Sequence, residues 1–99
     1  MEFEWDAGKA ASNRRKHGVS FEEAATVFAD PYALTDPDPV HSVEEDREIT
    51  VGRTNRSRIV VVVTTRRNGR MRIISARRAS KREVDLYEEE IRRANRGER

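Results

Sequence analysis

The sequence predicts an α+β domain, in which an antiparallel sheet of about four strands has two helices before it and one after it. The run from 59 to 63 is made of β-branched residues, as in a buried strand, and the Asn-Gly pair at 68–69 folds the chain into a hairpin. Helix-start patterns led by Ser20 and Ser80 stand on either side of these strands. A chain of 99 residues can form one modest core, so we expect a single domain over residues 1–99.

The N-terminal segment is expected to form a short strand followed by a helix. Residues 2–5 alternate polar and aromatic side chains, and Asp6 can cap the helix with its carboxylate. The helix should run to about Lys16 and stop at Gly18, because glycine readily adopts the left-handed conformation that ends a helix. Trp5 is best explained as a core residue, since a single tryptophan contributes most when it is buried.

A second helix is expected to begin after Ser20. Ser20 and Glu23 have the spacing of a capping box, and apolar residues follow at helical spacing up to Phe28. The pair Asp30 and Pro31 ends this helix, because proline cannot continue it.

The strands of the sheet are expected at residues 32–35, 47–52, 59–63 and 71–77. With a two-residue turn at 68–69, Val63 lies opposite Ile74 across the hairpin. This register predicts that Arg72 and Arg77 point to opposite faces of the sheet, so that they cannot both meet one phosphate.

The C-terminal helix is expected to begin after Ser80, which has Glu83 at capping-box spacing. Its apolar stripe consists of Val84, Tyr87, Ile91 and Ala94. A strand end followed by a helix start is a natural place for an anion, and Arg77, at the end of its strand, is the better arginine candidate there.

Charge is divided along the chain although the net charge is only +2. Residues 19–46 hold eight acidic residues and no Lys or Arg, whereas residues 47–82 hold twelve Lys or Arg and one acid, Glu48. A basic block of this density favours a polyanion such as nucleic acid. A solvated surface that happens to be basic is the other interpretation.

Several classes of protein are excluded or disfavoured. The chain has no cysteine, so thiol chemistry is absent and a reducing cytoplasm is the natural location. The longest apolar run, residues 59–63, cannot span a membrane. His17 and His41 are too few for a histidine-built metal centre, and we expect neither metal nor cofactor. An acidic Pro-containing loop is usually a solvated connection, which is our interpretation of Asp36, Asp38, Glu44, Glu45 and Asp46.

The first helix is expected to present polar groups along one outward stripe, which consists of Lys9, Asn13, Lys16 and His17. Such a stripe could meet a phosphate or an acidic partner. The alternative for His17 is that it stabilises the end of its helix, where a cationic side chain favours the last carbonyls.

Three segments together carry a resemblance to a known family. They are WDxxKxxxNxxKHGVSFEEAxxVFxDP at the start, EDREITVG in the middle and RIISARRASKRExxxY near the end. The chain resembles the BrnT family of type II toxin–antitoxin systems from Phe3 to Tyr87.

The resemblance implies a RelE-like fold and a ribonuclease toxin that cleaves RNA and inhibits translation. It also implies a BrnA-type antitoxin that neutralises the toxin in a heterotetramer with two copies of each chain. In this family the antitoxin also binds operator DNA, so this chain would reach DNA only through its partner.

Metal-free RNA cleavage needs a base for the 2′-hydroxyl, cations for the phosphorane and an acid for the departing oxygen. Histidine titrates near neutrality, so His17 is the expected base. We predict a catalytic set of His17, Lys16, Arg72 and Arg77. We predict RNA contacts from Lys9, Asn13, Arg47, Arg78, Lys81 and Arg82. Tyr87 is either a core residue or a proton donor.

Two other functions remain open at the level of sequence. The same cations could belong to a binding module without catalysis, which docks nucleic acid or an antitoxin. A DNA-binding regulator is the weaker alternative, because no recognition helix with base-reading side chains can be identified.

Overall fold

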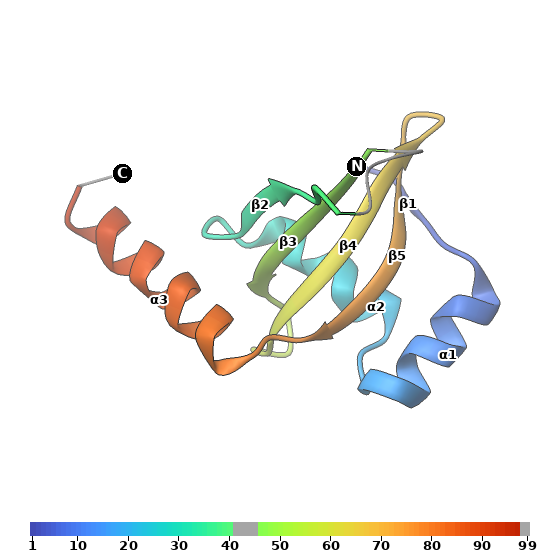
Figure 1. Cartoon of the computed structure of the whole chain (residues 1–99), viewed down its shortest axis with the longest axis horizontal. Coiled ribbons are helices and arrows are strands. Elements are labelled where there is room, and N and C mark those ends of the chain that lie inside the picture. Colours follow the sequence, from blue (N-terminus) through green and yellow to red (C-terminus); the bar gives the residue numbers. More distant parts are fainter. Residues whose placement is uncertain (41–45, 98–99) are drawn as a thin grey trace.

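A computed structural model describes residues 1–40 and 46–97 and shows one five-stranded sheet with three α-helices (Figure 1). His41, Glu44 and Glu45 lie outside the described residues. The strands are β1 (Phe3–Glu4), β2 (Leu34–Pro37), β3 (Arg47–Arg53), β4 (Ile59–Arg67) and β5 (Arg70–Arg78). Their order across the sheet is β1-β5-β4-β3-β2. The α+β class is confirmed.

The prediction of about four antiparallel strands is wrong in number and in one direction. The sheet is mixed, because β1 runs parallel to β5, with Phe3 opposite Met71 and Glu4 opposite Arg72. The other neighbouring pairs are antiparallel. A two-residue strand carries too little pattern to reveal its partner or direction, since its pairing is set by contacts far away in the chain.

Local signals place the ends of α1 (Ala7–His17) correctly. The carboxylate of Asp6 accepts a hydrogen bond from the backbone N–H of Lys9 at 2.8 Å. Gly18 ends the helix in the left-handed conformation, with φ 70°. These are the cap and the stop that the sequence predicts.

The second helix is shorter than its apolar pattern suggests. α2 (Phe21–Ala25) continues as the 3₁₀ helix η1 (Thr26–Ala29). Ser20 caps α2 by accepting a hydrogen bond from the N–H of Glu23 at 3.0 Å. The expected capping box is not completed, because the Glu23 carboxylate accepts hydrogen bonds from Arg58 and Thr54.

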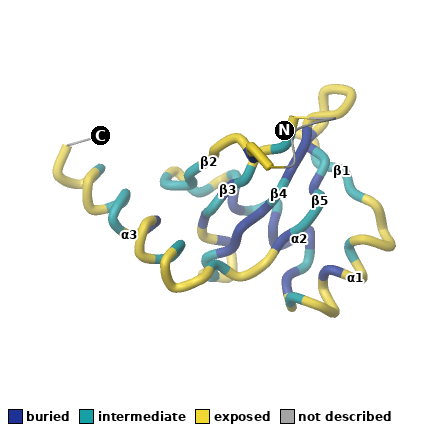
Figure 2. The backbone as a smooth tube through the Cα atoms, viewed as in Figure 1, coloured by how far each residue is buried: buried dark blue, intermediate teal, exposed yellow. Residues whose placement is uncertain are grey.

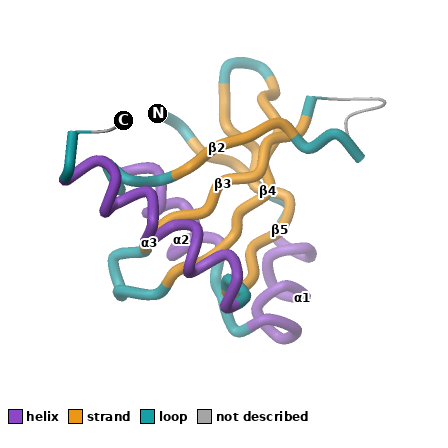
Figure 3. Tube along the Cα trace, turned by 60° about the vertical axis from the view of Figure 1, so that its left-hand side comes forward, coloured by secondary structure: helices purple, strands orange, loops and turns teal. Residues whose placement is uncertain are grey.

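The third helix, α3 (Lys81–Asn95), begins with the expected capping box of Ser80 and Glu83. It lies toward the β2 and β3 side of the sheet, whereas α1 lies toward β5 (Figures 1 and 3). Tyr87, in its apolar stripe, is 1% exposed, and its hydroxyl donates to Asp30 at 2.5 Å. One buried tyrosine therefore anchors the middle of α3.

The β4–β5 hairpin contains the predicted turn and an unpredicted bulge. Asn68 and Gly69 both have positive φ, 53° and 76°, as a two-residue primed turn requires. The predicted register holds up to Thr64, which lies opposite Ile73, but the ladder then shifts by one residue. Val63 therefore lies opposite Ser75 and not opposite Ile74, which corrects the expected pairing.

One face of the sheet packs against α1, α2 and η1 and forms the core. The core cluster contains Val60 and Val62 from β4 and Ile73 and Ala76 from β5, with Val19, Phe21, Ala24 and Val27 from the helical segment. Trp5 packs against this cluster, with its ring edge-on to Phe21 at 6.0 Å between centroids. Figure 2 shows this burial along β4.

The opposite face of the sheet, here called the open face, has no helix packed along it among the described residues. Val61 is buried, but Ile49, Val51 and Val63 on this face remain half-buried. Residues 59–63 are therefore not buried on both faces throughout, because Val63 lies on the uncovered side.

Candidate functional site

The end of α1 is fixed beside β5 by the side chain of Asn13, which is 8% exposed. Its carboxamide donates to the Ala76 carbonyl at 2.7 Å and accepts from the Ala76 N–H at 3.1 Å. It also donates to the carbonyl of Val19 at 3.1 Å. β1 pairs with β5 only at Met71 and Arg72, so Asn13 takes the place of a neighbouring strand at Ala76.

The expected outward stripe of α1 is wrong at Asn13 and at His17. The side of the helix turned toward the sheet carries Ala10, Asn13 and His17, which are buried or half-buried. Lys9 and Lys16 are exposed. The Asn13 carboxamide is engaged inside the fold, and we leave it out of the proposed RNA-contacting set.

An ion pair holds the residue that follows His17. Arg58 donates to the Gly18 carbonyl at 3.0 Å and to the Glu23 carboxylate at 2.9 Å. Thr54 donates to the same carboxylate at 2.8 Å. The hydrogen bond from Arg58 lowers the pKa of Glu23, although burial acts against it. The sequence placed Arg58 only in a basic block, and no local pattern reveals this contact.

Arg78 lies on the same side of the sheet as the end of α1. Side chains alternate along a strand, and Arg78 pairs with the core residue Val60, so it points to the helix-covered face. The backbone N–H of Ala79 bonds to the Ile59 carbonyl at 3.0 Å, which keeps the end of β5 against β4. The structure thus gathers Lys16, His17 and Arg78 at the same end of the sheet.

Arg72 and Arg77 share the open face, which corrects the prediction that they point to opposite faces. The bulge adds one residue between them and so reverses the alternation. They remain five positions apart along β5, which is roughly 15 Å, so one phosphate cannot meet both. Arg77 instead lies near the end of β5 that α1 and α3 approach.

Both open-face arginines are held by carboxylates. Arg72 donates to Glu4 at 2.8 Å, and Arg77 forms two hydrogen bonds of 2.8 Å with Glu83. The hydrogen bond from Arg77 is the main cause that lowers the pKa of Glu83 to about 2. Glu83 also caps the backbone N–H of Ser80 at 2.8 Å, so it orients Arg77 relative to the start of α3.

The first turn of α3 adds exposed positive charge to this end of the sheet. Lys81 and Arg82 are both exposed. Lys81 pairs with Asp85 at 3.2 Å, but a pair this exposed adds little stability and leaves the ammonium accessible.

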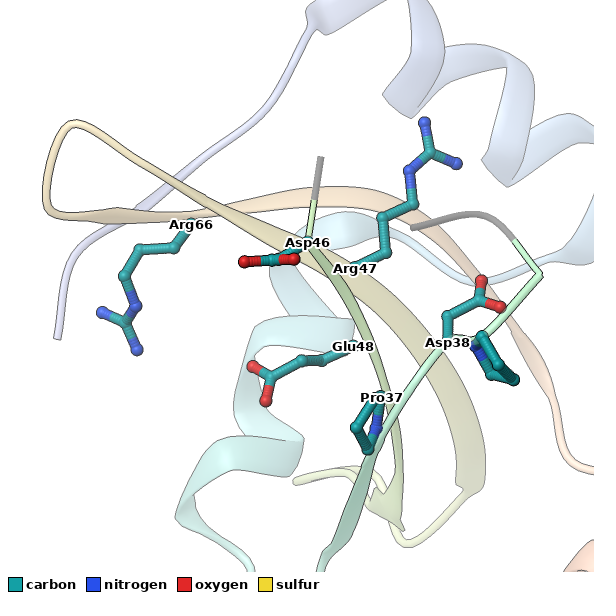
Figure 4. Close-up of a pocket in the computed structure, with 7 residues that line it drawn as sticks. Pro37, Asp38, Asp46, Arg47, Glu48 and Arg66 are labelled. Carbon is teal, nitrogen blue, oxygen red and sulfur yellow. The ribbon is translucent and has the colours of Figure 1, made fainter. Parts of the chain in front are cut away.

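Arg47 lies elsewhere, in a hollow with mixed charge (Figure 4). It pairs with Thr65, which pairs with Arg72, so these two arginines lie in one row across the sheet, away from Arg77. The hollow is lined by Pro37, Asp38, Pro39, Asp46, Arg47, Glu48 and Arg66. Its carboxylates offset the two guanidinium groups, which makes it a weaker phosphate site than the end of β5.

Tyr87 belongs to the core, which resolves the alternative left open by the sequence. Burial, followed by the hydrogen bond to the Asp30 carboxylate, raises the pKa of Tyr87 to about 12. A buried phenol that donates to a carboxylate is a poor proton donor to RNA.

Within residues 1–40 and 46–97, no three His, Cys, Asp or Glu residues are grouped so that they could hold a metal ion. No helix in the described part of the chain is long and apolar enough to cross a membrane.

The fold and this site define a class of small α+β proteins in which helices cover one face of the sheet and cations gather at one end of it. Such a cationic surface attracts polyanions. The family model described as the ribonuclease toxin BrnT of type II toxin–antitoxin systems matches residues 5–83. The chain belongs to this BrnT family of ribonuclease toxins.

A solved relative shares the fold. The crystal structure of the Brucella abortus ribonuclease toxin BrnT superposes with a TM-score of 0.61 at 25% sequence identity. The match covers 82% of this chain and 99% of the Brucella chain. No curated protein sequence matches the chain.

Proposed function

We propose that this chain is an endoribonuclease toxin that cleaves RNA without a metal ion, inhibits translation and is neutralised by a BrnA-type antitoxin. The family match over residues 5–83 carries this proposal. The gathering of Lys16, His17 and Arg78 at one end of the sheet supports the location of the site. The cytoplasm and a complex with two copies of each chain belong to the same proposal.

In the proposed reaction, the imidazole of His17 takes the proton of a ribose 2′-hydroxyl. The 2′-oxygen attacks the adjacent phosphorus, and the bond from phosphorus to the 5′-oxygen breaks. The departing 5′-oxygen takes a proton from water, and the imidazole of His17 later releases its proton to the solvent, so the products are a 2′,3′-cyclic phosphate and a 5′-hydroxyl. In this proposal Lys16 and Arg78 supply the positive charge that stabilises the phosphorane.

Arg77 and Arg72 have different roles in this proposal. Arg77 lies near the same end of β5 and would reach a phosphate from the open face if RNA replaced Glu83 as its partner. Arg72 and Arg47 lie in the distant row and would contact RNA beyond the cleaved bond. Lys9, Lys81 and Arg82 would attract the backbone.

Cleavage of single-stranded RNA by the purified chain, in buffer with EDTA, tests the site. We expect His17→Asn to lower the cleavage rate by at least about 100-fold, as loss of a general base does. We expect Arg78→Gln to lower it by about 10-fold or more, because a cation near the phosphorane is lost. Arg93→Gln, at the far end of α3, is the matched control and should cleave like the unchanged chain.

Three results would contradict the proposal. Full activity of His17→Asn would show that another group is the base. Loss of all cleavage on adding EDTA would show that the reaction needs a metal. Intact RNA with every variant, including the unchanged chain, would favour the binding module without catalysis. Thermal melting of each variant confirms that the fold is retained.

A further inference from the structure

The open face of the sheet carries a trough whose apolar floor the proposed RNA-cleaving site does not use, although Arg77 of that site lies on its rim. Two hollows, of about 200 and 250 Å³, share Ile49 and Glu83 among their lining residues and so adjoin each other along the sheet. The floor of the trough is aliphatic and consists of Leu34, Ile49, Val51, Val61 and Val63. This trough runs between α3 and residues 38–40, which follow β2.

Both ends of the trough leave a large apolar side chain in water. Val40 is 72% exposed and Leu86 is 57% exposed. Among the described residues, Met1 is the other exposed large hydrophobic residue. Apolar groups that surround an aliphatic floor mark a surface that binds another apolar surface.

RNA does not fit this trough. None of its lining residues is aromatic, so bases would find no ring on which to stack. Asp36 lies on the β2 wall, and within the described residues its carboxylate has no ion pair or hydrogen bond. An uncompensated carboxylate repels phosphate and attracts a cationic side chain. An apolar protein segment that carries a lysine or arginine opposite Asp36 complements the trough.

We infer that the antitoxin docks in this trough, with apolar side chains against Ile49 and Val63 and a cationic side chain against Asp36. Since the chain belongs to a type II toxin family, an antitoxin is the protein partner that the family implies. The inference rests on the proposed function and adds the surface through which the toxin is neutralised.

Docking there would also explain how the antitoxin inhibits the toxin. Arg77 lines the trough beside Glu83, so an occupant covers it. An occupant also blocks the path across the open face to the row that contains Arg72. RNA is then excluded from the arginines of this face, while the helix-covered face keeps its structure.

The test uses charge substitutions at exposed positions on the full chain. Leu86→Glu and Val40→Glu place a carboxylate at the two ends of the trough, and Asp36→Lys reverses the charge on its wall. Ala11→Glu is the matched control, because Ala11 is exposed on α1 and lines a different hollow. Calorimetry measures binding of the BrnA-type antitoxin that the proposed function names.

We expect each trough variant to bind the antitoxin at least about 30-fold more weakly, because it places an unfavourable charge inside the interface, with Ala11→Glu within about 2-fold of the unchanged chain. The trough variants should still cleave RNA, and the antitoxin should no longer inhibit them. Unchanged binding by the trough variants, or weaker binding by Ala11→Glu alone, would overturn the inference. Weaker binding of single-stranded RNA by Leu86→Glu would also overturn it, since RNA would then occupy the trough.

Failure of the proposed function is separable from failure of this inference. A chain that cleaves no RNA contradicts the proposed catalysis, whereas the calorimetric comparison reports on docking by itself. Melting curves of all four variants show whether weaker binding results from a damaged fold. If the loss of binding parallels the fall in melting temperature across the variants, the inference that the antitoxin docks in the trough is contradicted.

Discussion

Asn13 and Asp30 each join elements that are far apart in the chain. Asn13 links α1 to β5 through both polar groups of Ala76. Asp30 accepts hydrogen bonds from the hydroxyl of Tyr87 and from the N–H groups of Arg53 and Tyr32. Each residue satisfies groups that would otherwise be unpaired, so its contribution to stability exceeds that of a surface polar residue.

Replacing Asn13 by alanine should lower the free energy of unfolding by about 2–3 kcal/mol, because three hydrogen bonds are lost and the Ala76 groups are left unpaired. Urea unfolding measures the change. Ser12→Ala, at an exposed neighbouring position, should stay within about 0.5 kcal/mol of the unchanged chain. An equal effect of the two substitutions would show that Asn13 does not stabilise the contact between α1 and β5.

Residues that act locally were predictable, and residues that act across the fold were not. The Asp6 cap, the Gly18 stop and the capping box at Ser80 follow from positions a few residues apart. Asn13 reaches a strand more than sixty positions later, and its type and spacing on a helix also fit a surface residue. Asp30 was interpreted only as part of a helix stop.

At the scale of elements, Tyr87 anchors the middle of α3, and the Arg77–Glu83 pair holds its first turn. The ring of Tyr87 also lies beneath the Arg53 guanidinium at 5.9 Å. Leu86, one residue earlier, points into the trough and stays exposed. The position of α3 therefore follows from the contacts of Tyr87 and Glu83, and with it the position of one wall of the trough.

Removal of the Tyr87 hydroxyl should change how the free energy of unfolding falls at alkaline pH. The folded chain holds the pKa of Tyr87 at about 12, above the ordinary value of about 10, so the neutral phenol favours the folded state. This contribution is present below about pH 10 and is lost as the pH rises toward 12.

The variant Tyr87→Phe should lose about 1–2 kcal/mol at neutral pH and show a flatter decline between pH 10 and 12. Urea unfolding across that range measures both effects. Tyr32→Phe is the control, because the hydroxyl of Tyr32 makes only a long hydrogen bond of 3.5 Å, at an exposed contact with Asn95. Parallel declines for Tyr87→Phe and the unchanged chain would contradict the assignment.

The bulge in β5 is the element that the sequence could not predict. A strand pattern shows which residues are apolar, and both Ile73 and Ile74 are apolar, so the pattern allows either one to face the core. The structure buries Ile73 and leaves Ile74 half-buried. This choice decides the face of Arg77, and hence it decides whether Arg77 can line the trough.

At the scale of the whole molecule, charge is uneven although the net charge is +2. The end of the sheet carries Lys16, Arg78, Lys81 and Arg82. Arg58, another cation of the basic block of residues 47–82, is instead paired with the Glu23 carboxylate. Only part of the basic block is therefore available to a polyanion. The sequence shows that the block of residues 47–82 is basic, and the fold decides which of its cations are accessible to a polyanion.

Binding of single-stranded RNA should weaken steeply with salt, since phosphate contacts release counterions. Four contacts, from Lys16, Arg78, Lys81 and Arg82, account for a slope of about −3 for log affinity against log salt. The contacts proposed for Lys9, Arg47, Arg72 and Arg77 would make the slope steeper. Fluorescence anisotropy with the His17→Asn chain measures this slope without cleavage.

The double variant Lys81→Gln with Arg82→Gln should reduce the slope by about 1.4. A matched loss of two charges, Arg92→Gln with Arg93→Gln, should leave the slope unchanged, because these residues lie at the far end of α3. Equal slopes for the two double variants would place the RNA elsewhere.

The contact between Asn13 and Ala76 has a consequence for how copies of this chain behave toward one another. β1 is two residues long, so much of the outer border of β5 has no strand beside it. Such a border invites strand pairing between molecules, the first step of aggregation. By occupying the N–H and carbonyl of Ala76, a helix side chain blocks this border, so Asn13 protects the solubility of the toxin as well as its stability.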